Sequence, residues 1–87
     1  MFNFPDDCII PESAQIADNV KIGPRVVLSG GGIVLRENVR LDAACVIGEG
    51  VNVEQGAWVR TGAVVLRSVP PNAIVEGNPA QVVGYLN

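Results

Sequence analysis

The cysteines and carboxylates are the side chains that could act as nucleophiles, bases or metal ligands. Cys8 and Cys45 fit no CxxC or CxxH spacing, and the 87 residues include no histidine. We therefore expect neither a metal site nor a cysteine nucleophile activated by histidine. The possible bases that remain are typical of ionised surface groups, so no catalytic residue is assigned; they are Glu37, Asp42, Glu49, Glu54 and Glu76.

The charge balance limits the classes of partner. Six Lys and Arg residues against nine Asp and Glu residues give a net charge of -3. No overall basic field therefore attracts nucleic acid or an anionic membrane surface. The apolar runs are short, which argues against a signal peptide or a membrane span. We predict a cytoplasmic protein with neither nucleic acid nor membrane as a partner.

A six-residue repeat organises the chain from residue 10 to residue 70. Its aliphatic positions are Ile10, Ile16, Ile22, Leu28, Leu35, Leu41, Ile47, Val53, Val59 and Val65. Four places after each stands a small or apolar residue, namely Ala14, Val20, Val26, Gly32, Val39, Cys45, Val51, Ala57, Ala63 and Val69. A fixed internal period is typical of a solenoid, and the triglycine at 30–32 adds one residue to it. Cys45 is accordingly predicted to be a small core residue.

Each unit of the repeat predicts one short strand and one corner. An apolar, a variable and an apolar residue follow one another, so two side chains point inward and one points outward. The last corner residue is often Gly or Asn, which tolerate the left-handed conformation. These residues are Asn19, Gly31, Asn38, Gly50, Gly56 and Gly62. Three such sides close a triangular coil of about 18 residues.

The ends of such a prism must be covered, because the terminal units of a solenoid expose their core. Phe2 and Phe4 precede the repeat and are expected to cap the N-terminal end. We predict one all-β domain, residues 1–87, a little over three coils long. Its repeat core is expected at 10–70 and an exit segment, containing a C-terminal exit strand, at 71–87.

The repeat and the tail together resemble a known family. The tail reads VPPN at residues 69–72 and GNPA at residues 77–80. Hexads followed by these motifs are similar to the hexapeptide-repeat acyltransferases, whose fold is a left-handed parallel β-helix. The resemblance implies acyl-CoA as a co-substrate, no permanently bound cofactor and a parallel homotrimer.

Stacked coils place the outward residues in three columns. The first column is apolar and contains Val27, Val46 and Val64. Because exposed apolar stripes often mark association, we expect these valines at the contact between subunits. Surface valines that simply favour β-structure are the alternative. The third column is expected to contain Gln15, Ile33 or Val34, Asn52 and Pro70.

The second column contains Lys21, Arg40 and Trp58. Lys21 and Arg40 repel each other one coil apart unless an anion or solvent intervenes. Arg40 is also placed to stack on Trp58 as a cation–π pair. We expect a groove for a phosphate-bearing ligand here. The alternatives are a solvated basic edge, balanced by Glu37 and Glu54, or a salt-bridged part of the trimer contact.

The resemblance further implies an acyl-CoA groove between subunits near the last coils. Gly62 and Ala63 keep the small profile that lets a pantetheine arm approach the backbone. Arg67 stands where the family often has a basic residue, whereas Leu66 replaces a common threonine and Gln81 replaces the usual Lys or Arg. The candidate cofactor-binding residues are therefore Arg67, Gly62, Ala63, Gln81, Lys21, Arg40 and Trp58.

Two functions of different classes stay open. The first is a minimal CoA-dependent acyltransferase, or an acyltransferase-like protein that binds acyl-CoA in the groove between subunits. The second is a non-catalytic trimeric binding or scaffold module that keeps the fold only. Family members generally use a histidine base, and these residues contain none, so the sequence does not decide whether the chain is an enzyme.

Overall fold

The computed structural model describes residues 4–86, and in this range it has strands but no helix. Accordingly, the described residues include no helix that could cross a membrane. Most strands are very short because the chain turns a corner after each one. The strands are β1 (Gln15–Ile16), β2 (Lys21–Ile22), β3 (Val27–Leu28), β4 (Val34–Leu35), β5 (Arg40–Leu41), β6 (Val46–Ile47), β7 (Asn52–Val53), β8 (Trp58–Val59), β9 (Val64–Val65), β10 (Ala73–Gly77) and β11 (Ala80–Tyr85).

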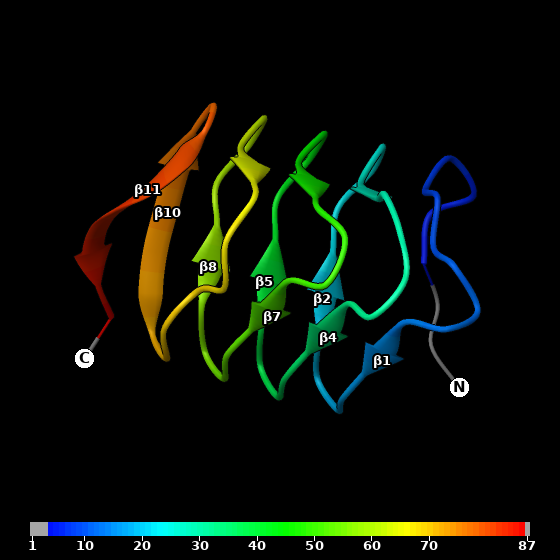
Figure 1. Cartoon of the computed structure of the whole chain (residues 1–87), viewed down its shortest axis with the longest axis horizontal. Helices are drawn as coiled ribbons and strands as arrows, with labels where there is room; N and C mark the ends of the chain where they lie inside the picture. The colour runs from blue at the N-terminus through cyan, green and yellow to red at the C-terminus, as the bar shows by residue number, and fades with distance from the viewer. Residues whose placement is uncertain (1–3, 87) are drawn as a thin grey trace.

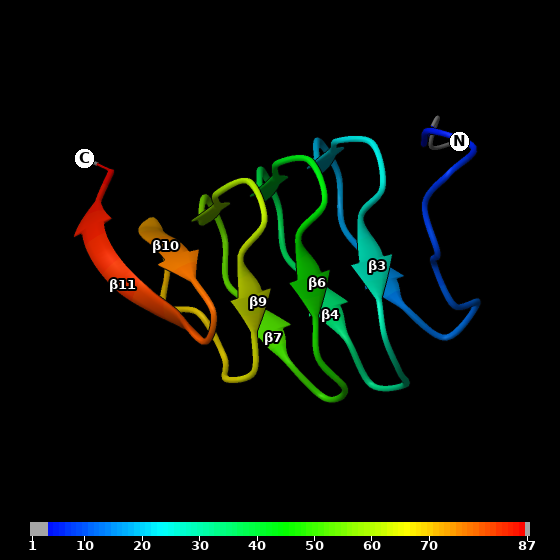
Figure 2. The same cartoon turned by 90° about the horizontal axis from the view of Figure 1, so that it is seen from above.

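Three sheets form the sides of a triangular prism. One side contains β1, β4 and β7, and a second contains β3, β6 and β9. The remaining side contains β2, β5, β8, β10 and β11 in this order. Figure 1 shows β2, β5 and β8 following one another along the prism, and Figure 2 shows β3, β6 and β9 doing the same. The chain forms the predicted left-handed parallel β-helix.

The aliphatic residues of the repeat fill the inside of the prism. The larger ones among them, each at most 1% exposed, are Leu28, Leu35, Leu41 and Ile47. Cys45 is fully buried, as predicted. Within residues 4–86 no polar or charged side chain is buried. One predicted inward position was wrong: Ile33 is buried and Gly32 is exposed, because the added residue shifts this side by one place.

Left-handed backbone marks the corners between sides. The predicted corner residues with positive φ are Asn19, Asn38, Gly50, Gly56 and Gly62. At the triglycine the prediction was wrong by one residue, since Gly32 and not Gly31 has the positive φ, of 72°. Arg25 and Ala44 also adopt φ of 61° although both carry a Cβ. Such a residue costs roughly 1–2 kcal/mol, which the packing of the coils must offset.

The third column begins as expected on the side that contains β1, β4 and β7. Val34 pairs with Gln15 in β1 and with Asn52 in β7. Of the two residues left open by the sequence, Val34 is therefore the outward one and Ile33 the inward one. The register follows from the buried neighbours, because Ile33 and Leu35 both point into the core.

The third column does not continue to Pro70, so this prediction was wrong. Val69 bridges to Val53, and the hydroxyl of Ser68 accepts the backbone N–H of Asn52 at 3.3 Å. Ser68 thus takes the place beside Asn52. The corner at 66–68 is therefore short, since Val69 follows its partner Val53 by 16 residues, whereas Val65 follows its partner Ile47 by 18. The prolines at 70 and 71 lie in the next corner, where the missing amide hydrogen of proline costs no strand pairing.

After this corner the chain adds one more strand to the prism. β10 pairs with β8 in parallel, and Ala73 and Val75 are its buried inward residues. Ile74 follows its partner Trp58 by 16 residues, whereas Trp58 follows Arg40 by 18. The last coil is therefore shorter than the one before it. The exit strand is β11, which pairs antiparallel with β10 at the edge of the sheet.

The segment before the repeat lies against the first coils. Phe2, one of the two predicted cap residues, lies outside the described residues, and Phe4 is half-buried. The carboxylate of Asp7 accepts the backbone N–H of Arg25 at 3.2 Å and lies 3.8 Å from its Nε. The Cys8 thiol donates to the carbonyl of Gly23 at 3.2 Å. These contacts tie residues 7 and 8 to the corner at 23–25.

Candidate functional site

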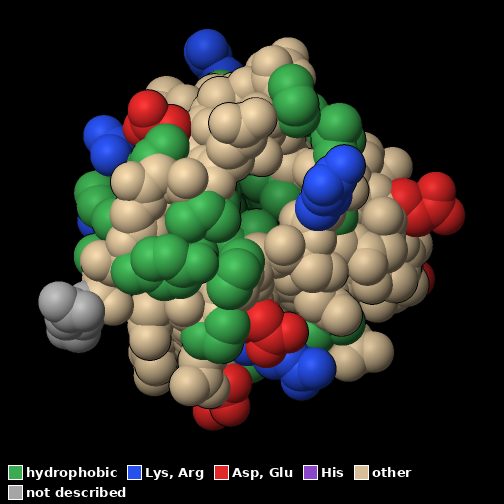
Figure 3. All heavy atoms as spheres, turned by 60° about the vertical axis from the view of Figure 1, so that its left-hand side comes forward, with side chains coloured by type: hydrophobic (Ala, Val, Ile, Leu, Met, Phe, Trp, Pro, Cys, Tyr) green, Lys and Arg blue, Asp and Glu red, His purple; other side chains and the backbone are tan. Residues whose placement is uncertain are grey.

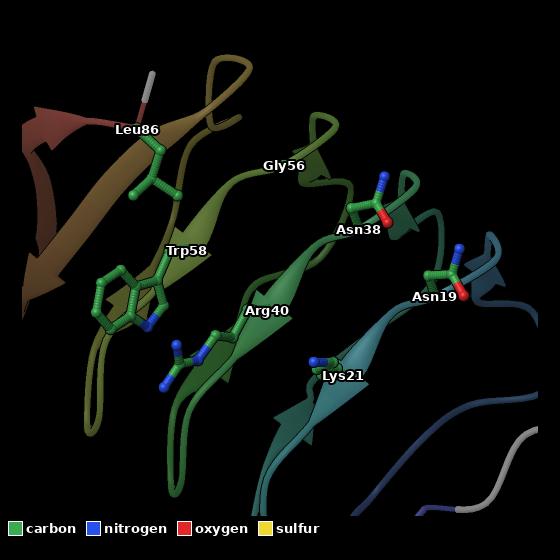
Figure 4. Close-up of a pocket in the computed structure, with 7 residues that line it drawn as sticks. All are labelled: Asn19, Lys21, Asn38, Arg40, Gly56, Trp58 and Leu86. Carbon is green, nitrogen blue, oxygen red and sulfur yellow. The ribbon is translucent and has the colours of Figure 1, made fainter.

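Lys21, Arg40 and Trp58 stand one above another on the side that contains β2, β5 and β8. Lys21 pairs with Arg40, and Arg40 pairs with Trp58. Each is the outward residue of its strand, since the residue after it points toward the core. The side chains of all three come from successive coils (Figure 4). The structure thus contains the predicted basic column.

A hollow of about 480 Å³ lies over this column. We call it the column hollow; it is lined by Asn19, Lys21, Asn38, Arg40, Gly56, Trp58 and Leu86. The asparagines occupy the left-handed corner beside Lys21 and Arg40, and Leu86 lies on the same side of the hollow as Trp58 (Figure 4). The hollow is therefore cationic and polar over the earlier coils, and apolar near the C-terminal end.

Asp42 organises the column from the next corner. One carboxylate oxygen accepts the Nε–H of Arg40 at 3.0 Å, and the other accepts the indole Nε1–H of Trp58 at 2.8 Å. Its side chain is only 20% exposed. Sequence reasoning treated Asp42 as an ordinary surface carboxylate and missed this role. The available signal was its position two residues after Arg40, which places both on the same side of an extended strand.

The indole of Trp58 contacts two guanidinium groups. The Cζ of Arg40 lies 4.4 Å from the ring centroid, and the Cζ of Arg60 lies 4.7 Å from it. The predicted cation–π pair with Arg40 is present, and the one with Arg60 was missed. Arg60 in turn lies 3.8 Å from a carboxylate oxygen of Glu76. Cation–π contacts of this kind hold the indole in place and contribute about 0.5–1 kcal/mol each at exposed sites.

A second hollow lies at the C-terminal end, between the corner after β9 and the start of β11. We call it the tail hollow; its volume is about 290 Å³ and it is lined by Leu66, Arg67, Pro79, Ala80 and Gln81. Two of the predicted cofactor-binding residues, Arg67 and Gln81, therefore meet here. No ion pair to Arg67 occurs within residues 4–86.

The predicted valine column lies on the side that contains β3, β6 and β9. Val27 pairs with Val46, Val46 pairs with Val64, and Ile9 bridges to Val27. The valines are half-buried, and Ile9 is 60% exposed. Figure 3 turns the C-terminal end forward and shows hydrophobic side chains gathered there as well. The exposed apolar residues of this end are Leu66, Val82, Val83, Tyr85 and Leu86.

Comparison with known proteins identifies relatives of the chain, although no protein-family model matches it. The 2,3,4,5-tetrahydropyridine-2,6-dicarboxylate N-acetyltransferase of Staphylococcus aureus strain JH9 is 39% identical over 72 residues, covering 75% of this chain and 30% of that protein. A bacterial transferase hexapeptide repeat, the serine O-acetyltransferase of Brucella melitensis, superposes with a TM-score of 0.84 and 37% identity over 90% of this chain and 33% of that one. The homologues of this chain are hexapeptide-repeat acetyltransferases.

The resemblance to the hexapeptide-repeat family is thereby confirmed. Serine acetyltransferase from Brucella abortus strain S19, in complex with coenzyme A, superposes with a TM-score of 0.86 and 34% identity. This superposition covers 91% of the present chain and 34% of the Brucella chain. The chain spans 30% of the length of the Staphylococcus relative. The similarity thus covers most of this chain but only about a third of each of these hexapeptide-repeat proteins.

Two predicted cofactor-binding positions of the hexapeptide-repeat motif line neither hollow. Gly62 forms a corner with φ of 73°, and an added Cβ would meet no atom within 4 Å. Ala63 is fully buried inside the prism. Gly62 therefore exposes its backbone at the surface, whereas Ala63 packs inside the prism and cannot contact a ligand at the surface.

The chain contains no histidine, so its cysteines and carboxylates are the remaining candidates for a base. Burial raises the pKa of the Cys45 thiol to about 12, and the charge of Asp42 adds to this effect. The carboxylate of Asp42 is already engaged by hydrogen bonds from Arg40 and Trp58. Glu37, Glu49 and Glu76 are exposed, and Glu54 is half-buried. Within residues 4–86 no group of three or more metal-ligating side chains comes together.

Proposed function

We propose that the chain binds acyl-CoA as an acyltransferase-like protein, with CoA as a co-substrate and not a resident cofactor. The observation that carries the proposal is the superposition of 91% of this chain on a serine acetyltransferase in complex with coenzyme A, at 34% identity. The Staphylococcus relative is also an N-acetyltransferase. Both are similar to most of this chain, so binding of an acyl-CoA ligand is the function that their similarity supports.

The tail hollow is the site that we propose for acyl-CoA. Arg67 is exposed and has no acidic partner within residues 4–86, so its guanidinium is available to a phosphate group. The Leu66 side chain and the Pro79 ring offer apolar surface beside it. The amide of Gln81 can donate a hydrogen bond but brings no charge. We therefore expect weaker binding than a second cation at this position would give.

We further propose that the chain forms a parallel homotrimer through the valine column. The column runs along one side of the prism, and charged side chains do not interrupt it. Burial of this stripe against a second copy removes apolar surface from water. A subunit on this side would also approach the corner of Gly62, where the bare backbone leaves room for a pantetheine arm. A cytoplasmic location also stays a prediction.

A non-catalytic binding or scaffold module is the second candidate function. The specific observation in its favour is the lack of histidine in these residues, together with the burial of Cys45 and the engagement of Asp42. An acyl transfer needs a group that removes a proton from the acceptor. In this alternative the chain binds acyl-CoA, or only a protein partner, without turnover.

Calorimetric titration of the chain with CoA and acetyl-CoA tests the proposal. We expect saturable binding, and we expect Arg67→Ala to weaken it about tenfold or more, because a charge-assisted hydrogen bond contributes about 1.5–3 kcal/mol. Arg36→Ala is the matched control: Arg36 is also exposed, has no acidic partner within residues 4–86 and does not line the tail hollow.

The outcomes separate the candidate functions. The absence of binding at millimolar CoA would reject the acyl-CoA proposal. Equal losses in Arg67→Ala and Arg36→Ala would reject the tail hollow as its site. An assay of acetyl transfer to a panel of amines and hydroxyl compounds, in which the release of free CoA is measured, distinguishes an enzyme from a binding module.

A further inference from the structure

The protein neutralises the cationic part of the column hollow only in part. Lys21 and Arg40 are direct partners on neighbouring strands, which lie about 4.8 Å apart in such sheets. The three ion pairs of residues 4–86 join Arg25 to Asp7, Arg40 to Asp42 and Arg60 to Glu76. The ammonium of Lys21 thus has no acidic partner there. Like charges at directly opposite positions are destabilising unless an anion lies between them.

Asp42 fixes the Arg40 guanidinium without using all of its donors. Arg40 donates only its Nε–H to Asp42. The terminal amino groups of Arg40 make no hydrogen bond within residues 4–86. Arg40 lines the column hollow beside its strand partner Lys21, and its guanidinium extends toward the Trp58 ring (Figure 4). The two amides of Asn19 and Asn38 line the same part of the hollow and can donate further hydrogen bonds. Donors from two strands and from the corners of two successive coils therefore line one hollow.

The other part of the column hollow has a different chemistry. The Trp58 indole is half-buried, is held by Asp42 and contacts the guanidinium of Arg40. Leu86 adds an aliphatic side chain next to it (Figure 4). Gly56 contributes only backbone to the lining, because the amide of Asn72 occupies the place that a side chain would take there. A flat apolar group fits here, because aromatic rings pack well against indole and aliphatic surface.

From this arrangement we propose that the column hollow binds a small molecule that carries both a phosphate group and a planar ring. The phosphate lies between Lys21 and Arg40, and the ring lies beside Trp58 and Leu86. A phosphate dianion presents three acceptor oxygens, enough for both cations and a corner amide, whereas a carboxylate presents two. This site goes beyond the proposed acyl-CoA site, because the two hollows share no lining residue.

The single tryptophan of the chain makes the proposal directly measurable. Because Trp58 lines the hollow, its fluorescence reports occupancy by any ligand there. We expect phenyl phosphate and adenosine monophosphate to change the emission saturably. Benzoate and inorganic phosphate each lack one part of the ligand, and we expect them to bind about tenfold or more weakly. The relative affinities of the first two distinguish a nucleotide from a simpler aryl phosphate.

Two variants test the assigned contacts. We expect Lys21→Ala to weaken phenyl phosphate binding about tenfold or more, with CoA binding unchanged in the calorimetric titration. Arg36→Ala removes an equal charge from outside the hollow and should leave phenyl phosphate binding within about twofold. Arg67→Ala should affect CoA alone. Each variant is compared in the same oligomeric state, as established by native mass spectrometry.

Several outcomes overturn the proposal. They are the absence of a saturable fluorescence change at millimolar phenyl phosphate, equal binding by Lys21→Ala, and dissociation of the assembly by Lys21→Ala. Displacement of phenyl phosphate by CoA with the same sensitivity to Lys21→Ala would assign the hollow to acyl-CoA itself. Failure of CoA to bind at all rejects the proposed function while leaving the phenyl phosphate result intact.

Discussion

At the scale of single residues, Cys45 illustrates how the prism controls reactivity. The residue stands at a repeat position that points inward and is fully buried. Burial raises the pKa of its thiol from 9.0 to about 12, since the interior disfavours the thiolate, and the nearby charge of Asp42 acts in the same direction. Thiolates and not thiols react with electrophiles. Cys45 is therefore a structural residue, and its behaviour reports on folding.

The raised pKa of Cys45 predicts a loss of stability at high pH. Above about pH 9 the thiol of the unfolded chain loses its proton, while the folded chain keeps it until about pH 12. The folded state then binds more protons than the unfolded state, so the free energy of unfolding falls as the pH rises. We expect the urea midpoint to fall between about pH 8 and about pH 10, and to fall less in Cys45→Ala. Equal declines in the two proteins would contradict this explanation.

The contacts of Asp42 and Trp58 show which interactions the sequence could predict and which it could not. The stacking of Arg40 and Trp58 followed from the 18-residue period, because both occupy the outward position of a strand. The hydrogen bonds of Asp42 join the corner of one coil to the face of the next. They depend on the exact height and twist of the stacked coils and on the side-chain rotamers. A repeat pattern contains no information about these quantities.

At the scale of elements, the corners determine the shape of the prism. The corner column of Arg25, Ala44 and Gly62 joins the side of β2, β5 and β8 to the side of β3, β6 and β9. The backbone N–H of Ala44 donates to Pro24 at 2.9 Å, and that of Gly62 donates to Ala43 at 3.0 Å. All three residues have positive φ, but only Gly62 lacks a Cβ. The hydrogen-bonded stack therefore imposes a left-handed conformation on residues that disfavour it.

This corner column predicts opposite effects for two substitutions. Ala44→Gly relieves a left-handed residue with a Cβ and should raise the free energy of unfolding by about 0.5–1 kcal/mol, after allowance for the more flexible unfolded chain. Gly62→Ala introduces the same strain and should lower it by about 1 kcal/mol. The added methyl of Gly62→Ala meets no atom within 4 Å, so packing does not obscure the comparison. Urea titration measures both, and effects of equal sign would contradict the argument.

At the scale of the whole molecule, the three sides of the prism have different chemistry. The side of β3, β6 and β9 presents valines, and the side of β2, β5 and β8 presents the basic column. The tail hollow lies at the C-terminal end. A trimer through the valine column would leave the outward residues of the basic side to a ligand or to a neighbouring subunit. The arrangement favours separate surfaces for association and for ligands.

The proposed trimer predicts a position-specific effect of a buried charge. Val46 lies in the middle of the valine column, so Val46→Glu would desolvate carboxylates at the subunit contact and should dissociate the trimer in native mass spectrometry. Val34→Glu is the matched control: Val34 is also the half-buried outward residue of a central strand, but on another side of the prism. A trimer that survives Val46→Glu, or that dissociates equally in both variants, would exclude this contact.

The amino-acid sequence by itself determined the coil, because every unit of a solenoid repeats the same local arrangement. Each unit has two inward side chains, one outward side chain and a corner. The period, the inward residues and the columns of Val27 and Lys21 all follow from it. Tertiary structure decided what breaks the period. The triglycine moved the corner to Gly32, and the short corner between Val65 and Val69 shortened the last coil.

Tertiary structure also divided the candidate site residues between two hollows. Lys21, Arg40 and Trp58 line one, whereas Arg67 and Gln81 line the other. This separation depends on how β11 folds back along the sheet, which brings Leu86 to Trp58 and Gln81 to Arg67. The path of a strand after its last repeat unit is set by long-range pairing and not by local periodicity. The sequence could name these residues, and only the fold could show which of them meet.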